Sequence, residues 1–96
     1  MELHSFRHKA LERFYRHGSE RGLPAQSVGK LRNQLAFLES MSDTRELMSP
    51  VLRWKAHELS GERAGGWALS VTANWRLTFT VDDRGRLCDL TLEDYH

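Results

Sequence analysis

The chain has 96 residues, which is enough for one compact domain and too few for two. Its 40% hydrophobic and 28% charged residues are typical of a globular domain and exclude a disordered tail. A single cysteine, Cys88, excludes an internal disulfide and a multi-cysteine zinc site. No apolar run reaches the roughly 20 residues of a membrane span, and the charged N-terminus lacks a signal-peptide segment. We therefore expect one cytoplasmic domain over residues 1–96, with no membrane partner.

The formal net charge of +1 hides a basic N-terminal third. Residues 1–32 carry seven Lys or Arg and three acidic residues, whereas the rest of the chain carries seven basic and ten acidic residues. Within this third, Lys9, Arg13 and Arg16 recur at helical spacing. Taken alone, the spacing is typical of the solvated stripe of an amphipathic helix, but it also presents cations that can contact phosphate. Both interpretations stay open at this point.

The first residues predict a short strand followed by a helix. Leu3 and Phe6 alternate with polar residues, which suggests a first strand. Apolar residues that share one helical face predict a helix over residues 7–17, and Gly18 is placed to end it.

A second helix is predicted from Pro24, which suits a first helical turn, to Met41. Its apolar residues recur at spacings of three and four. The short break that contains Gly22 favours an antiparallel helical hairpin. Residues 42–50 predict one further helical turn, closed by a proline.

After residue 50 the apolar period changes from about 3.6 to 2, which predicts strands. Four strands are expected, over residues 52–59, 67–72, 75–81 and 86–93. The linkers between them are rich in turn formers, which favours consecutive antiparallel hairpins. The predicted fold class is α+β, with an N-terminal helical hairpin packed on one face of a twisted, mainly antiparallel sheet.

Alternation along these strands predicts a cationic sheet face. In the third strand, Arg76 alternates with Trp75 and Leu77, which are expected in the core. The polar set of the first strand, expected on the same face as Arg76, consists of Arg53, Lys55 and His57. In the last strand, Cys88 falls in the core set and Tyr95 on the polar face.

The sequence ends on Asp94, Tyr95 and His96, directly after the last predicted strand. Strict alternation would bury Asp94 and His96, which an unpaired carboxylate resists, so we expect the strand to fray or bulge there. Such a conflict is compatible with a functional site and also with a disordered terminus.

The polar residues on this face can supply the roles that RNA cleavage requires. The reaction needs a base for the 2′-OH, an acid for the departing 5′-oxygen and a cation for the phosphate. The candidates are His57, Arg76, Asp94 and His96. A strand histidine beside a tryptophan is usually a packing residue, so the functional interpretation of His57 depends on its neighbours. The residues do not decide which histidine is the base, and Asp94 would orient a histidine or raise its pKa.

Several segments resemble the HigB toxins of the RelE/ParE superfamily, the plasmid maintenance system killer proteins. The helical hairpin is generic, whereas GW, NWRLTF and the terminal DYH are together distinctive. The resemblance implies a RelE-like fold and the toxin of a type II toxin-antitoxin system. It also implies a metal-independent endoribonuclease, an mRNA interferase without cofactor, that cleaves mRNA in the ribosomal A site. The implied partner is a HigA-type antitoxin with a helix-turn-helix region.

Five positions of this sequence match the catalytic residues of the family: His57, Arg76, Asp94, Tyr95 and His96. The implied roles are stabilisation of the phosphorane by Arg76 and positioning of the base or sugar by Tyr95. The chain departs from the family at Ser60, where several relatives have a lysine, and Arg63 or Lys55 is a candidate replacement.

Candidate RNA- and ribosome-binding residues are Lys9, Arg13, Arg16, Arg53, Lys55 and Arg63. An alternative function is a catalytically silent RNA- or ribosome-binding module that still pairs with an antitoxin. The missing lysine favours this alternative, whereas the five retained residues argue against it.

Overall fold

The computed structural model describes residues 1–94 and contains two α-helices, three short 3-10 helices and four strands. The helical elements are α1 (Lys9–His17), η1 (Ala25–Ser27), α2 (Val28–Ser40), η2 (Thr44–Met48) and η3 (Gly61–Arg63). The strands are β1 (His57–Glu58), β2 (Gly66–Ser70), β3 (Trp75–Val81) and β4 (Leu87–Asp94). In the described range, no helix has the length and apolar character needed to cross a membrane.

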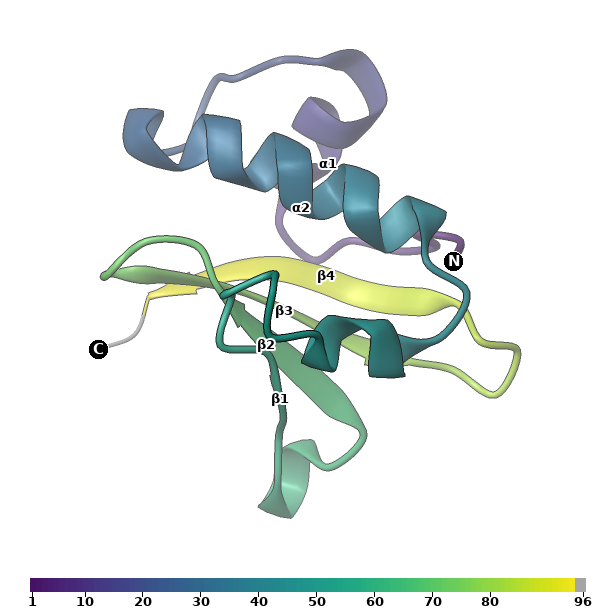
Figure 1. Cartoon of the computed structure of the whole chain (residues 1–96). Coiled ribbons are helices and arrows are strands. Elements are labelled where there is room, and N and C mark those ends of the chain that lie inside the picture. The colour runs from purple at the N-terminus through teal and green to yellow at the C-terminus, as the bar shows by residue number, and fades with distance from the viewer. Residues whose placement is uncertain (95–96) are drawn as a thin grey trace.

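The four strands form one sheet in the order β1-β2-β3-β4, and each neighbouring pair is antiparallel. The predicted succession of hairpins is therefore confirmed. Both α-helices lie on the same side of this sheet, whereas β1 and η3 project away from them (Figure 1). We call the sheet face opposite α1 and α2 the open face.

Helix α1 ends where the sequence predicts. The side chain of His8 accepts a hydrogen bond from the backbone N–H of Leu11 at 3.1 Å, which caps the N-terminus. Gly18 ends the helix with φ 74°, a left-handed conformation that costs glycine little. Helix α2 packs its apolar stripe into the core, where Leu31 and Leu38 are fully buried.

The N-terminal residues run beside β4 without forming a strand. Leu3 and Phe6 make isolated parallel bridges to Leu87 and Leu90. The predicted first strand is thus reduced to two bridges, because β4 is bulged between these contacts and the ladder cannot continue.

The predicted core position of Cys88 is wrong because of the bulge in β4. Pairing between β3 and β4 shifts by one residue next to Thr80, and Asp89 adopts φ 55° there. Alternation does not carry through a bulge. As a result, Leu87 is buried in the core, whereas Cys88 pairs with Thr80 and is only partly buried.

The strand predicted over residues 52–59 is wrong for most of its length, because only His57 and Glu58 pair with β2. Arg53 has φ 56° and Lys55 has φ 52°, both in the left-handed region, where a strand cannot continue. The helical turn predicted over residues 42–50 is confirmed as η2.

Candidate functional site

Strand register places His57 and Arg76 on the open face in neighbouring rows. His57 pairs with Ala68 of β2, and Ala68 pairs with Thr78 of β3, so these residues form one row across three strands. Arg76 lies two residues before Thr78 and therefore on the same face. Two strand spacings, about 10 Å, separate the backbones of His57 and Thr78, so side chains from both strands border one surface. The predicted common face of His57 and Arg76 is confirmed.

Glu93 is the centre of a cluster on this face. Its Oε1 accepts hydrogen bonds from Nη1 of Arg63 at 3.0 Å and from Nη2 of Arg76 at 3.1 Å. Its Oε2 accepts from Nη2 of Arg63 at 2.5 Å and from the hydroxyl of Thr78 at 2.6 Å. Two guanidinium groups and one hydroxyl therefore hold a single carboxylate.

These contacts set the charge of the cluster. The hydrogen bonds from Arg63, Thr78 and Arg76 outweigh partial burial and lower the pKa of Glu93 from 4.5 to about 2. The same contact with Glu93 raises the pKa of Arg63. At neutral pH two guanidinium cations share one carboxylate in this cluster, and guanidinium groups are also well suited to bind a phosphate.

Arg63 reaches this cluster from the end of η3, the short 3-10 helix that begins directly after Ser60. The sequence leaves both Arg63 and Lys55 as candidates to replace the lysine that several relatives have at the position of Ser60. The structure brings Arg63, and not Lys55, next to Arg76 through Glu93. Glu93 and Thr78 were missed as site residues, because a polar strand residue gives no sign of which distant cations it meets.

The imidazole of His57 is exposed at the start of β1. Its Nδ1 lies 3.0 Å from the backbone oxygen of Lys55. Since a carbonyl oxygen only accepts, Nδ1 donates in this contact, and in a neutral imidazole Nε2 is then the nitrogen that can accept a proton. The geometry suits His57 to accept a proton.

Strand β4 continues in register to Asp94, which pairs with Trp75, so the fraying or bulge expected at Asp94 is wrong for that residue. Its cross-strand partner places Asp94 on the opposite face from Arg76. The carboxylate is still exposed, because this end of the sheet is incompletely covered and Trp75 itself is only partly buried. Tyr95 and His96 lie outside the described residues.

The other candidate cations occupy separate places. Lys9, Arg13 and Arg16 line a shallow hollow on α1, within the helical layer, and Arg16 bonds Glu12 at 2.9 Å. Arg53 and Lys55 line a second hollow together with Lys30. The expectation that Arg53 and Lys55 alternate in strand register beside Arg76 is wrong, because their left-handed backbone ends the alternation.

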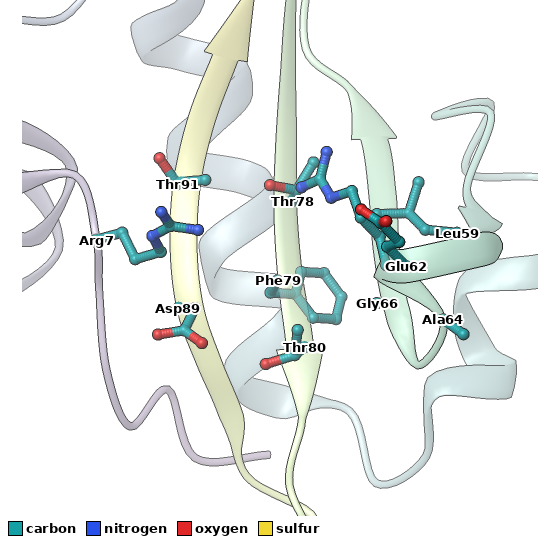
Figure 2. A pocket seen from close by; sticks show the side chains of 11 residues that line it. Arg7, Leu59, Glu62, Ala64, Gly66, Thr78, Phe79, Thr80, Asp89 and Thr91 are labelled. Carbon is teal, nitrogen blue, oxygen red and sulfur yellow. The ribbon is translucent and has the colours of Figure 1, made fainter.

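A cavity of about 230 Å³ lies beside the cluster on the open face (Figure 2). Its polar lining includes Arg7, Glu62, Arg63, Thr78, Asp89 and Thr91. Figure 2 shows the side chain of Arg7 extending over β4 toward Thr91, with Asp89 farther along the same strand. Within residues 1–94, no three His, Cys, Asp or Glu side chains gather as a group that could hold a metal ion.

Comparisons with known proteins identify the family and the fold of this chain. The model of a family described as "RelE-like toxin of type II toxin-antitoxin system HigB" matches residues 4–96. The protein named "Endoribonuclease HigB" from Proteus vulgaris is 37% identical over 92 residues, which span 96% of this chain and 97% of that protein.

Two solved structures share the fold. The YoeB/ParE toxin from Agrobacterium tumefaciens is 19% identical with a TM-score of 0.60, over 97% of this chain and 99% of that chain. A chain of the YoeB-YefM complex from Staphylococcus aureus is 18% identical with a TM-score of 0.56, over 100% of this chain and 99% of that chain. These likenesses confirm the expected RelE-like α+β fold.

Proposed function

This chain belongs to the HigB-like family of RelE-like toxins of type II toxin-antitoxin systems, and on that premise we propose that it is an endoribonuclease that cleaves mRNA in the ribosomal A site. The observation that carries the proposal is the open face of the sheet. There, a histidine with a basic Nε2 and two arginines border one surface. That combination provides a proton acceptor and a phosphate-binding charge for cleavage of RNA.

The proposed reaction is attack of a ribose 2′-oxygen on the adjacent phosphorus. Nε2 of His57 takes the proton of the 2′-OH as the new P–O2′ bond forms. The P–O5′ bond then breaks, His96 gives a proton to the departing 5′-oxygen, and the products are a 2′,3′-cyclic phosphate and a 5′-OH. Arg76 and Arg63 stabilise the charge on the phosphorane. Each proton-transfer group contributes about 10²- to 10⁴-fold.

Two further residues complete the proposed site. Tyr95 positions the base or sugar, and Asp94 orients His96 from the end of β4. None of these steps uses a metal ion or a cofactor. A general base, a general acid and positive charge at the phosphate are sufficient for this transesterification.

The proposed substrate implies a cytoplasmic location and two partners. A HigA-type helix-turn-helix antitoxin would neutralise the toxin. The ribosome would present an extended mRNA, and the stripe of Lys9, Arg13 and Arg16 would contact ribosomal RNA. Positioning by the ribosome supplies orientation that a shallow site on a small protein cannot impose alone.

The test compares cleavage of one mRNA, free and on programmed ribosomes, with products mapped and assayed for 2′,3′-cyclic ends. We expect negligible cleavage of free RNA and clear cleavage on ribosomes without added metal. His57→Ala lowers the rate by at least about 10²-fold, whereas the matched control His4→Ala, on the N-terminal segment, retains it. Ribosome binding without cleavage would instead support the silent binding module.

A further inference from the structure

The cavity of Figure 2 is contiguous with the proposed cleavage site. It shares Arg63 and Thr78 with the cluster around Glu93, so a group in the cavity lies directly beside a phosphate held by the two arginines. Its volume of about 230 Å³ accommodates one small planar group rather than a length of chain. The neighbour of a scissile phosphate that has this shape is a nucleobase.

Asp89 borders this cavity because of the bulge in β4. It is an aspartate with φ 55°, and its backbone N–H donates to the hydroxyl of Ser5 at 2.9 Å, which holds the bulge. Strained backbone of this kind costs free energy and recurs at functional sites. The carboxylate is exposed, and within residues 1–94 it makes neither a side-chain hydrogen bond nor an ion pair. Its acceptor oxygens are thus available to a ligand.

Arg7 faces the same cavity from the N-terminal segment. Its backbone N–H donates to the oxygen of Leu90 at 2.8 Å, so the residue is fixed beside the bulge. Its guanidinium extends over β4 and pairs with no carboxylate of the described chain (Figure 2). A donor and an acceptor, both without an ion-pair partner among the described residues, therefore stand on one rim.

The charged residues that line the cavity indicate which class of ligand it binds. Arg63 is already paired with Glu93, so the rest of the lining carries one guanidinium, of Arg7, against two carboxylates, of Glu62 and Asp89. Such a lining disfavours a phosphate and favours a neutral group with both donors and acceptors. An unstacked RNA base has this chemistry, because its edge forms hydrogen bonds and its face stacks on an arginine plane.

We propose that this cavity is a subsite for one base of the substrate RNA next to the scissile phosphate, read by Asp89 and covered by Arg7. The inference rests on the proposed endoribonuclease function and adds a source of base selectivity to it. A carboxylate accepts from the exocyclic amino groups of adenine, cytosine and guanine. Uracil has no exocyclic amino group, and its single N–H donor lies between two carbonyl oxygens that repel the carboxylate, so the subsite disfavours uridine.

The experiment uses the full chain, programmed ribosomes and messages in which each nucleotide flanking the scissile phosphate is varied in turn through the four bases. At one of the two positions, we expect uridine to be cleaved roughly 10-fold more slowly than the other three bases. In Asp89→Asn, the amide can both donate to and accept from uracil, so the difference falls to about twofold or less. Asparagine tolerates the left-handed backbone, so the fold is retained, which thermal unfolding checks.

The matched control is Asp83→Asn, which removes the same charge from an exposed turn residue that does not line the cavity and keeps the wild-type preference. Arg7→Lys keeps the charge but loses the planar surface, and it slows cleavage at all four bases alike. A wild-type protein without base preference at either position, or an Asp89→Asn variant with the wild-type preference, would overturn the subsite while leaving the cleavage function standing. Absence of cleavage of every message would instead overturn the proposed function, and the subsite with it.

Discussion

The carboxylate of Glu93 makes a measurable contribution to stability, and its removal tests the cluster on the open face. Glu93→Gln keeps the size and shape of the side chain but removes the negative charge that Arg63 and Arg76 share. The amide leaves the two guanidinium groups facing each other without an anion between them. We expect the variant to fold and to be less stable than the wild type at neutral pH.

The magnitude follows from the pKa of Glu93, lowered from 4.5 to about 2. A shift of that size corresponds to an upper limit of about 3 kcal/mol of folding free energy. The side chain of Glu93 is 24% exposed and that of Arg63 is 45% exposed, so solvent screens part of this. We expect a loss of about 1 to 2 kcal/mol, with roughly 4 to 8 °C in melting temperature for each kcal/mol.

The lowered pKa of Glu93 also predicts how its contribution to stability changes with pH. The folded state binds the proton of Glu93 less tightly than the unfolded state does, so the contribution is complete above pH 4.5. It is lost as the pH falls from 4.5 to about 2. Asp82 titrates in the same range, because its hydrogen bonds with Arg86 and Arg84 lower its pKa to about 2. The measurement is therefore the difference between wild type and Glu93→Gln across pH.

Urea unfolding followed by circular dichroism at several pH values measures this difference, and Glu58→Gln is the matched control. Glu58 is exposed on β1, and within residues 1–94 its side chain has neither a hydrogen bond nor an ion pair. The gap between wild type and Glu93→Gln closes toward pH 2, whereas Glu58→Gln follows the wild type throughout. A constant gap from pH 7 to pH 2 would refute the electrostatic account of the cluster.

Two further predictions separate function from packing. Arg76→Ala lowers ribosome-dependent cleavage by about 10²- to 10³-fold at a small cost in stability. Leu77→Ala, at a fully buried position, lowers the free energy of unfolding by about 2 to 5 kcal/mol. Equal destabilisation of the two variants in urea would contradict the assignment of faces. Removal of residues 94–96 abolishes growth arrest on expression, yet leaves the melting temperature nearly unchanged because Asp94 is exposed. A large fall in melting temperature would show that the end of β4 is structural.

The sequence predicts most elements of this fold because their apolar periods run without interruption. The strand predicted over residues 75–81 coincides with β3, and Gly18 ends α1 as expected. Alternation fails where non-glycine residues take a left-handed backbone. Arg53 and Lys55 break the first predicted strand, and Asp89 shifts Cys88 out of the core. Such conformations depend on tertiary contacts, which local propensity does not encode.

The site is predictable from sequence only in part, for a similar reason. His57 and Arg76 reach a common face through the pairing of regular strands, which period-2 counting captures. The ion pair between Arg63 and Glu93 joins η3 to β4 across 30 residues of sequence, and no periodic pattern signals it. Long-range pairs of charges are therefore where the structure adds most to the interpretation of the site.

The position of Arg63 yields the last prediction, which concerns the lysine that the family has at Ser60. Arg63→Ala removes the guanidinium held against Glu93 and lowers cleavage by about 10²-fold, the usual cost of one phosphate-stabilising donor. Adding Ser60→Lys restores part of the rate, because it returns a cation to the start of the same turn. Lys55→Ala removes an equal charge from a separate hollow and has a smaller effect than Arg63→Ala. Cleavage rates measured on programmed ribosomes test this prediction. A larger loss of rate in Lys55→Ala than in Arg63→Ala would show that Arg63 does not replace the lysine.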